Sequence, residues 1–358
     1  MVVQDRPMKV YVLKRLMLMI PTIFGIMLIT FTVTQFVPGG PVEQMVSQIR
    51  DAAGDNQMSG MGLMRYRGDK GLDPEQIEEL KTLYDFDKPP YVRFLNMMKD
   101  YVRFDLGKSY FHHSSVIGLI IQKLPVSVSL GLWTFMIVYL TCIPLGIRKA
   151  MTDGSRFDVI SSTIILVGYA IPGFVLGITL LVLLGGGGFL DIFPLRGLVS
   201  DNWRELTPWG KIGDYLWHIT LPVVSSVVGS LAVMTMLTKN SFIEEIRKQY
   251  VLTARAKGLN ENTVLYKHVF RNAVIPIITA FPAQFIMAFF AGSLLIETIF
   301  SLDGLGLLSY NSVIQRDYPV VLGILYLITI LGLFAKLITD LCYVLVDPRI
   351  QFESIDTR

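Results

Sequence analysis

The stretch "LMLMIPTIFGIMLITFTVTQFV", which runs from Leu16 to Val37, contains 22 residues and no charge. A helix rises about 1.5 Å per residue, so about 20 apolar residues cross the ~30 Å hydrocarbon layer of a bilayer. Lys14 and Arg15 directly precede the stretch, which lacks the small-residue site where a signal peptide is cleaved. We therefore expect a membrane-spanning helix that stays in the mature protein as an anchor.

The rest of the chain repeats this pattern. Of its 358 residues, 52% are hydrophobic and 17% are charged, whereas soluble domains carry about 25% charged residues. Five further runs are long and apolar enough to span a membrane: Leu124 to Ile147, a segment within Val159 to Leu190, Tyr215 to Thr238, Ala273 to Ile296, and Pro319 to Thr339. Because helices satisfy their own backbone hydrogen bonds in lipid, the sequence predicts an all-α membrane protein with six transmembrane helices.

The charges of the connecting loops predict the orientation. Lys and Arg outnumber Asp and Glu by 4 to 1 before the first run, by 3 to 2 between the second and third, and by 7 to 3 between the fourth and fifth. On the other side the counts are 3 to 4 and 1 to 3. Since positive loops stay in the cytoplasm, we expect both termini there.

This topology divides the chain into four segments. Residues 1–37 hold the N-terminal segment and the first helix, and residues 38–123 form a periplasmic loop subdomain with a helix predicted over Asp73 to Tyr84. Residues 124–346 form a five-helix core that contains the cytoplasmic loop 239–272, and residues 347–358 form a cytoplasmic tail.

Residue patterns for chemistry are almost absent. The chain has no G-x-x-x-x-G-K-[ST] phosphate loop. Its histidines form no metal-ligand pattern, and for His112 and His113 we favour a pair on an exposed loop over a metal site. Cys142 and Cys342 lie in apolar surroundings, which favours packing. We expect no catalytic, cofactor-binding or metal-binding residue, and the net charge of +3 gives no indication of a nucleic-acid partner.

Few charges interrupt the apolar runs. Lys336 and Asp340 lie four residues apart near the end of the last run, where snorkelling or an i,i+4 ion pair is favoured over proton transfer. Glu297 follows the fifth run, and two positions stay open for it, in the translocation path or at the membrane interface. Gly173 and Gly177 form a G-x-x-x-G pair that favours close helix packing.

The loop after the fourth run reads "YVLTARAKGLNENTVLYKHVFRNAVIP" from Tyr250 to Pro276. Residues Lys248 to Lys257 favour a helix, and Gly258 follows where a left-handed residue would end it. Asn260 can cap a second helix with Glu261 in its first turn. A positive-inside loop needs no such helix–glycine–helix break, so we favour a docking element.

The second helix of this loop has a predicted apolar face. Apolar residues recur at i, i+3, i+4 and i+7, which places Tyr266, Val269, Phe270 and Ala273 on one side. Lys267 and Arg271 occupy another face.

This loop resembles the EAA-type cytoplasmic loop of ABC importer permeases of the dipeptide/oligopeptide/nickel branch. The resemblance continues in order along the chain, through "LKRLMLMIPTIFGI", "GYAIPGFVLGI", "ETIFSLDGLGLL" and "DLCYVLVDPRI". The insertion "GLMRYRGDKGLDPEQIEEL" is most similar to Yej-type peptide importers. The resemblance implies the fold of a type I ABC importer permease, with an external loop subdomain, in the bacterial inner membrane.

The same resemblance implies function and partners. Its members transport oligopeptides, with peptide antibiotics as a further class, together with a second homologous permease, two ATPase domains that bind the ATP, and a periplasmic peptide-binding protein. The residues implied in coupling to the ATPase are Tyr250, Thr253, Ala254, Arg255, Ala256, Lys257, Gly258 and Leu259.

Two other functions compete with this one. An ion-coupled secondary transporter needs ionisable groups within the spans, and the sequence supplies almost none. An intramembrane enzyme needs a nucleophile–base or metal pattern, and none is apparent.

Overall fold

The computed structural model describes residues 5–37, 87–112, 114–290 and 292–346. The predicted helix at 73–84 and the C-terminal tail lie outside these ranges. The chain divides into two compact units, which are described separately below. The first consists of residues 1–15, 123–307 and 330–358, and the second of residues 16–122 and 308–329.

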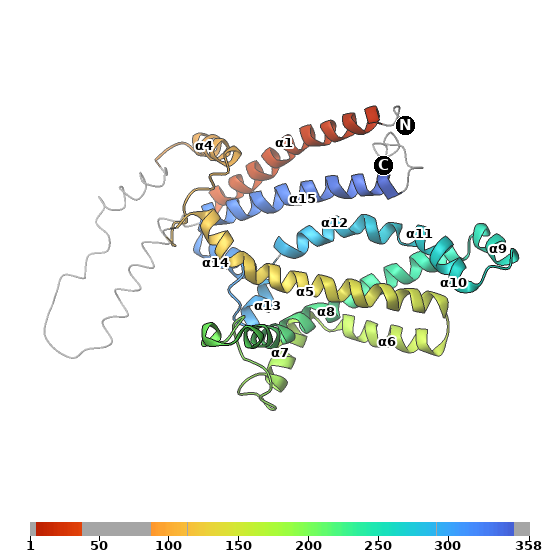
Figure 1. Ribbon diagram of the computed structural model, residues 1–358. Coiled ribbons are helices and arrows are strands. Elements are labelled where there is room, and N and C mark those ends of the chain that lie inside the picture. The colour runs from red at the N-terminus through yellow and green to blue at the C-terminus, as the bar shows by residue number, and fades with distance from the viewer. Residues whose placement is uncertain (1–4, 38–86, 113, 291, 347–358) are drawn as a thin grey trace. The chain divides into compact units, whose positions relative to one another are not determined.

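Helices account for nearly all of the regular structure, and the residues described contain no β-strand, only two isolated bridges. Four helices are long and apolar enough to span a membrane: α1 (Asp5–Phe36), α5 (Val116–Met151), α8 (Pro208–Ile246) and α15 (Tyr318–Val346). Two bent helix pairs raise the number of candidate spans to six if each pair counts once (Figure 1). The predicted all-α fold is confirmed, and the predicted six spans agree with this count.

The third predicted span is broken at a proline. Helix α6 (Arg156–Ala170) ends before Ile171, and α7 (Gly173–Leu184) begins after Pro172 at an angle of 90°. Proline lacks the N–H that would continue the helix and restricts the residue before it. The break at Pro172 is therefore a turn between two helices.

The fifth span is shorter than predicted. Helix α12 (Ile275–Phe290) follows α11 (Phe270–Ala273) at a bend of 50° and ends before Gly292, whose φ is +54°. A short helix, α13 (Leu294–Ile299), comes next. The apolar run continues through this break, so its composition could not predict where the helix ends.

Small residues allow close helix contacts in the first unit. A Cβ added to Gly173 would lie 3.0 Å from the Ser225 carbonyl oxygen of α8, and one on Gly131 of α5 would lie 1.7 Å from the Ala288 oxygen of α12. Helix association in lipid depends on such packing, so the packing role predicted for Gly173 is confirmed. Cys142 is fully buried in the same core and is a free thiol.

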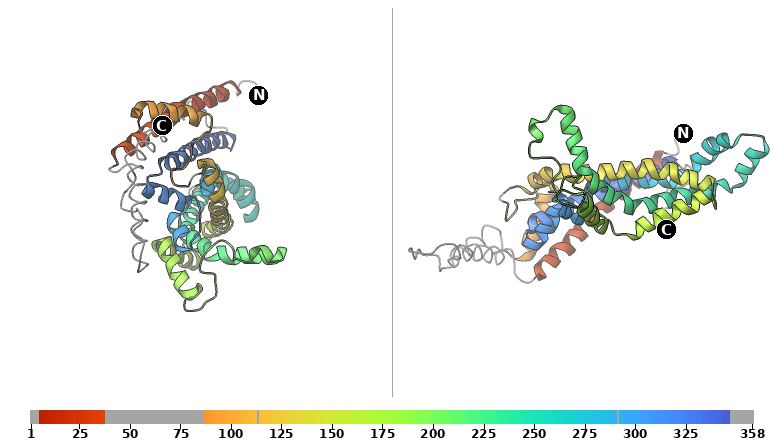
Figure 2. Two further views of the ribbon diagram at one scale, coloured as in Figure 1. Left: turned by 90° about the vertical axis from the view of Figure 1, so that its left-hand side faces the viewer. Right: turned by 90° about the horizontal axis from the view of Figure 1, so that it is seen from below.

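In the second unit, residues 87–122 fold onto parts of two long helices. Phe94 of α4 (Pro90–Val102) packs against Phe31 of α1 with ring centroids 5.4 Å apart, and α4 lies beside α1 in both views of Figure 2. The Tyr326 hydroxyl of α15 donates to the Tyr101 carbonyl at 3.0 Å. Asp317, fully buried, accepts a hydrogen bond from the Tyr110 amide at 3.1 Å. Part of the predicted external loop is thus an ordered element.

Candidate functional site

The loop between α8 and α12 forms a small folded element, here called the coupling module (residues 249–273). It contains α9 (Gln249–Ala256), α10 (Glu261–Thr263), the π-helix η2 (Val264–Val269) and α11. The module lies at one end of the first unit (Figure 1). The predicted helix–glycine–helix break is confirmed, because Gly258 has φ +77° and the Asn260 side chain accepts from the Thr263 amide at 2.7 Å.

The coupling module has its own apolar core. Val251 is fully buried and Ala254 is 6% exposed, and both belong to a cluster with Phe242 of α8 and with Val264 and Val269 of η2. Burial of these side chains joins α9 to the end of α8. The small size of Ala254 therefore serves packing within the chain, since its side chain does not face solvent.

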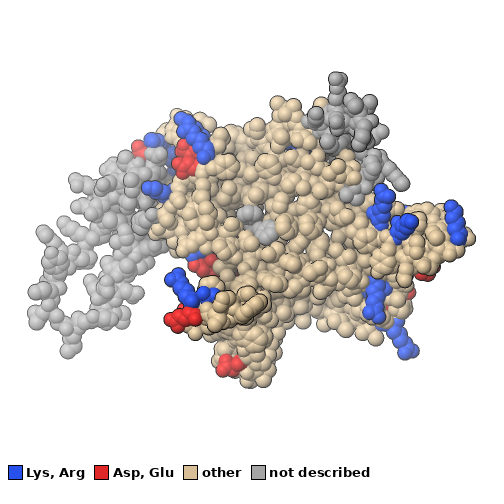
Figure 3. Space-filling view, in the orientation of Figure 1, with Lys and Arg blue, Asp and Glu red and all other residues tan. Residues whose placement is uncertain are grey.

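Most of the predicted coupling residues form one exposed surface. Tyr250 is half-buried and Ala254 is buried, whereas the other six are exposed: Thr253, Arg255, Ala256, Lys257, Gly258 and Leu259. Lys and Arg side chains on the first unit gather at the end that carries α9 and α10, where few acidic side chains are visible (Figure 3). The surface can thus meet an acidic partner.

Arg255 already has a partner within the chain. Its Nε and Nη2 donate to the two carboxylate oxygens of Glu261 at 2.9 and 3.0 Å. In the part of the chain that the structure describes, Lys257 makes no ion pair. The sequence reasoning assigned both cations to a partner protein and did not foresee this internal pair.

Tyr250 connects the module to both neighbouring helices. Its hydroxyl donates to Glu245 Oε2 of α8 at 2.7 Å and accepts from Asn272 Nδ2 of α11 at 3.2 Å. Burial and the hydrogen bond to Glu245 raise the pKa of Tyr250 above its usual value of 10.0. Sequence reasoning missed the role of Glu245, whereas Asn272 lies within the loop quoted in the sequence analysis.

The second helix of the loop differs from its prediction. Val269 and Ala273 are buried as expected, but Tyr266 is 62% exposed and Leu265 takes its place in the core. The cause is η2, because a π-helix bonds each residue to the fifth along the chain and so shifts the buried face. The face predicted from α-helical spacing is therefore wrong at Tyr266.

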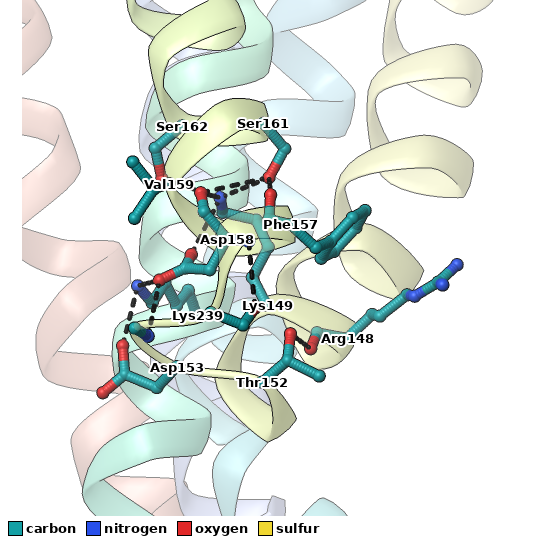
Figure 4. Close-up of polar contacts among 12 residues, drawn as sticks. Arg148, Lys149, Thr152, Asp153, Phe157, Asp158, Val159, Ser161, Ser162 and Lys239 are labelled. Atoms are coloured by element: carbon teal, nitrogen blue, oxygen red, sulfur yellow. Dashed lines mark hydrogen bonds and ion pairs between the residues drawn. The ribbon is translucent and has the colours of Figure 1, made fainter.

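A cluster of charges, with Lys149 and Asp158 buried and Asp153 exposed, joins three helices near the module. It consists of Lys149 of α5, Asp158 of α6, Lys239 of α8 and Asp153 of the α5–α6 turn, and is here called the latch cluster (Figure 4). Lys149 Nζ lies 3.0 Å from Asp158 Oδ1, and Lys239 Nζ lies 2.7 Å from Asp158 Oδ2 and 2.9 Å from Asp153 Oδ1. The side chain of Lys149 is completely buried.

Further hydrogen bonds satisfy the latch cluster. Lys149 Nζ also donates to the hydroxyls of Ser161 and Ser162 at 2.8 and 2.7 Å, and the Gly154 amide donates to Asp158. Removing one partner of a buried ion pair commonly costs about 3–5 kcal/mol. In the sequence these charges indicated only the orientation in the membrane, and their mutual contact was not predicted.

The first unit contains an open cavity of about 630 Å³. Its walls come from α5, α7, α8, α12 and α13, and they carry many small or hydroxyl-bearing residues: Ser127, Gly131, Thr134, Gly173, Ser225, Ser226, Gly229, Ser230, Gly292 and Ser293. Tyr139 and Gln284 also line it, and the Tyr139 hydroxyl donates to Gln284 Oε1 at 3.1 Å.

Glu297 lies at the edge of this cavity and is completely buried. Its carboxylate accepts hydrogen bonds from the Ser127 hydroxyl at 3.0 Å, the Ser293 amide at 3.2 Å and the Leu307 amide at 2.8 Å. The side chain of Glu297 thus lines the cavity, and whether this cavity belongs to the translocation path stays a prediction.

Glycines permit the backbone to approach this carboxylate. A Cβ on Gly304 would lie 2.6 Å from Oε1, and a Cβ on Gly306 would lie 3.0 Å from Oε2. The motif "ETIFSLDGLG" thus supplies both the carboxylate of Glu297 and the two glycines, Gly304 and Gly306, that lie against it.

Asp340 has a different partner from the one predicted. It lies 3.2 Å from Arg15 and accepts from the Tyr11 hydroxyl at 2.9 Å, whereas Lys336 is exposed. Of the two arrangements favoured above, the i,i+4 ion pair is therefore not formed among the described residues, since the N-terminal part of α1 supplies the cation, and snorkelling of Lys336 stays a prediction.

Comparison with known proteins identifies the family. Residues 142–352, which hold the latch cluster, the coupling module and most of the cavity, match the family described as "Binding-protein-dependent transport system inner membrane component". The chain belongs to this family. Family membership decides between the two transporter classes in favour of the binding-protein-dependent one, and it agrees with a multi-pass protein of the inner membrane.

Curated relatives extend the similarity to the whole chain. The peptidoglycan transport system permease protein YejB of Agrobacterium fabrum is 57% identical over 98% of this chain and 100% of its own length. The inner membrane ABC transporter permease protein YejB of Escherichia coli O157:H7 is 52% identical over 97% of this chain, and the oligopeptide permease AppB of Bacillus subtilis is 30% identical over 96%, each along its full length.

Proposed function

We propose that this chain is a permease subunit of an ABC importer that carries peptides across the bacterial inner membrane. One observation carries the proposal. Similarity runs along the whole chain to a permease named for peptidoglycan transport, at 57% identity, and to oligopeptide and dipeptide permeases, at 30 and 31%. Peptides or peptide-bearing cell-wall fragments are the substrate class common to these names.

Separate proteins complete the importer. A second homologous permease shares the translocation path, two ATPase domains bind and hydrolyse ATP, and a periplasmic binding protein delivers peptide. This chain takes no part in the hydrolysis, because it lacks a phosphate loop. The loop charges favour both termini, and with them the coupling module, in the cytoplasm.

The exposed surface of α9 is the contact with the ATPase. Closure of the ATPase dimer displaces α9, and the apolar core of the module and Tyr250 pass the displacement to α8. The latch cluster then carries the motion to α5 and α6 through Lys239 and Asp158. Since α5 and α8 both line the cavity, the motion of α9 changes the shape of that cavity.

The experiment is reconstitution of the complex in proteoliposomes, with ATP hydrolysis and peptide uptake measured together. We expect ATP-dependent uptake with the wild-type chain, and no hydrolysis by the chain without its ATPase. Proton-driven uptake by this chain alone would overturn the proposal.

Two loop variants test the coupling surface. We expect R255E and G258V to leave the chain inserted but to weaken ATPase binding at least about tenfold, since charge reversal at a contact and a Cβ in the left-handed region are both unfavourable. G213A, at a site with no heavy atom within 4 Å of the added Cβ, is the control. Normal uptake by both loop variants would show that α9 does not couple to the ATPase.

Cysteines introduced at Ser59 and Asn262 test the orientation. An impermeant external thiol reagent should label the first and not the second. The opposite result would invert the topology.

A further inference from the structure

We infer that the cavity of the first unit binds a cationic group of the transported peptide, an ammonium from its N-terminus or from a side chain. This assignment rests on the proposed peptide transport and names the chemistry by which the cavity would select its substrate. It starts from the charges that line the cavity.

Glu297 is the one residue with a formal charge among the described residues that line the cavity. In the described ranges no Lys or Arg forms an ion pair with it. Asp158, the other deeply buried carboxylate of this unit, lies within 3.0 Å of two lysine ammonium groups. The cavity therefore carries a negative charge that no neighbouring side chain neutralises.

All three hydrogen bonds at the Glu297 side chain are donated to it. Ser127 Oγ accepts a hydrogen bond from the Leu305 amide at 2.8 Å, so its own proton is directed to Glu297. The other two contacts are backbone amides, which only donate. The surroundings of Glu297 thus supply donors only, which suits the acceptor-only form of a carboxylate.

The side chain of Glu297 is completely buried, so we expect no direct contact between its carboxylate and a ligand in the cavity. Its effect on the cavity is therefore electrostatic, and a charge acts over longer distances in a low-dielectric interior than in water. The cavity walls supply acceptors for direct contact, among them the Tyr139 and Gln284 side chains. Within the described residues, the buried Thr134 hydroxyl on the cavity wall has no hydrogen-bond partner.

The size of the cavity suits a short peptide segment. Its volume of about 630 Å³ lies within the range of roughly 300–1,000 Å³ of small-molecule sites. Glycine and serine walls leave room for side chains of different sizes. We therefore expect selection by charge to be stronger than selection by side-chain shape.

The test uses the complete importer with its binding protein in proteoliposomes. Four peptides are compared: Ala-Lys-Ala, acetyl-Ala-Lys-Ala, Ala-norleucine-Ala and acetyl-Ala-norleucine-Ala. The measured quantity is the ratio of uptake of each ammonium-bearing peptide to that of the last, which has none. Preferences of the binding protein are the same for every permease variant and cancel when these ratios are compared.

We expect E297Q to lower this ratio about fivefold or more, as the loss of one uncompensated charge near the cavity implies, and E297D to retain it. A fall for both free-amine peptides alone assigns the N-terminal ammonium, and a fall for both lysine peptides alone assigns the side chain. An unchanged ratio in E297Q that still transports would overturn the assignment, even if total uptake drops.

A second pair of variants applies if E297Q does not assemble. Gln284 is exposed within the cavity wall, so Q284K introduces a cation there and Q284M provides a control of similar length without the charge. Q284K should lower the ratio and Q284M should not, and equal ratios would overturn the assignment. If the wild-type complex hydrolyses ATP but takes up none of the four peptides, the proposed peptide function itself fails.

Discussion

Asp158 and Glu297 are both buried carboxylates of the first unit, but they are stabilised in different ways. Asp158 contacts two lysines, whereas Glu297 contacts one hydroxyl and two backbone amides. A carboxylate paired with cations joins helices without leaving a net charge. One held by backbone amides has no cation beside it and requires glycines, because the backbone must approach it. The arrangement at Asp158 connects helices mechanically, and the arrangement at Glu297 influences the electrostatic potential of the cavity.

The largest loss of stability should appear when Asp158, the carboxylate paired with lysines, is neutralised. D158N leaves Lys149 without a carboxylate in a buried position, and we expect a loss of about 3–5 kcal/mol in stability. The measurement is thermal or denaturant unfolding of the detergent-solubilised complex. The double variant D158N/K149M should regain part of the loss, because it removes the buried cation as well. A stability equal to that of the wild type would show that the latch cluster does not hold the helices together.

The next largest loss of stability is expected from substitution of a glycine that lies against Glu297. G304A places a Cβ 2.6 Å from Glu297, so either the carboxylate or the turn must move, at a cost of about 1–3 kcal/mol. G332A in α15 is the matched control, since no heavy atom lies within 4 Å of its added Cβ. The same unfolding measurement should show a lower stability for G304A than for G332A. Equal stabilities of the two variants would contradict the close packing of Gly304 against Glu297.

A smaller effect is expected at Glu245, which accepts its hydrogen bond from a tyrosine. Y250F should cost about 1 kcal/mol, the usual contribution of a hydrogen bond. The pKa of Tyr250 is raised in the folded chain, so its contribution to stability is full below pH 10 and is lost as the pH rises beyond that value. Unfolding at pH 8 and pH 11 should show a steeper loss for the wild type than for Y250F, and parallel losses would contradict this.

The smallest effect belongs to the exposed pair Arg255–Glu261. Their side chains are 37 and 58% exposed, and exposed ion pairs contribute about 0–1 kcal/mol. E261Q should therefore unfold almost as the wild type does, although it frees Arg255 for an acidic partner. A loss of stability in E261Q as large as that in D158N would contradict the distinction between buried and exposed ion pairs.

Local signals in the sequence predicted a large part of the fold. Apolar runs indicated the spans, and the turn at Gly258 and the cap at Asn260 followed from backbone preferences that each residue carries by itself. The end of α12 was not predictable, because the residues around Gly292 are as apolar as the helix before them.

The contacts of the candidate site depend on distant parts of the chain. Asp158 and Lys239 are 81 residues apart, and each alone resembles an ordinary charge at a helix end. Ser127 and Glu297 are 170 residues apart, so nothing near Glu297 showed that its carboxylate would be buried. The π-helix was missed because the apolar spacing of residues 266–273 fits an α-helix as well.

The π-helical turn η2 stands between the exposed surface of α9 and the cavity wall formed by α12. A π turn holds one more residue than an α turn, so a change between the two bonding patterns shifts the register by one residue. One residue corresponds to about 100° of rotation in an α-helix with 3.6 residues per turn. A change of bonding pattern within residues 264–269 would therefore turn the helix that follows them about its own axis, ahead of the 50° bend that leads into α12.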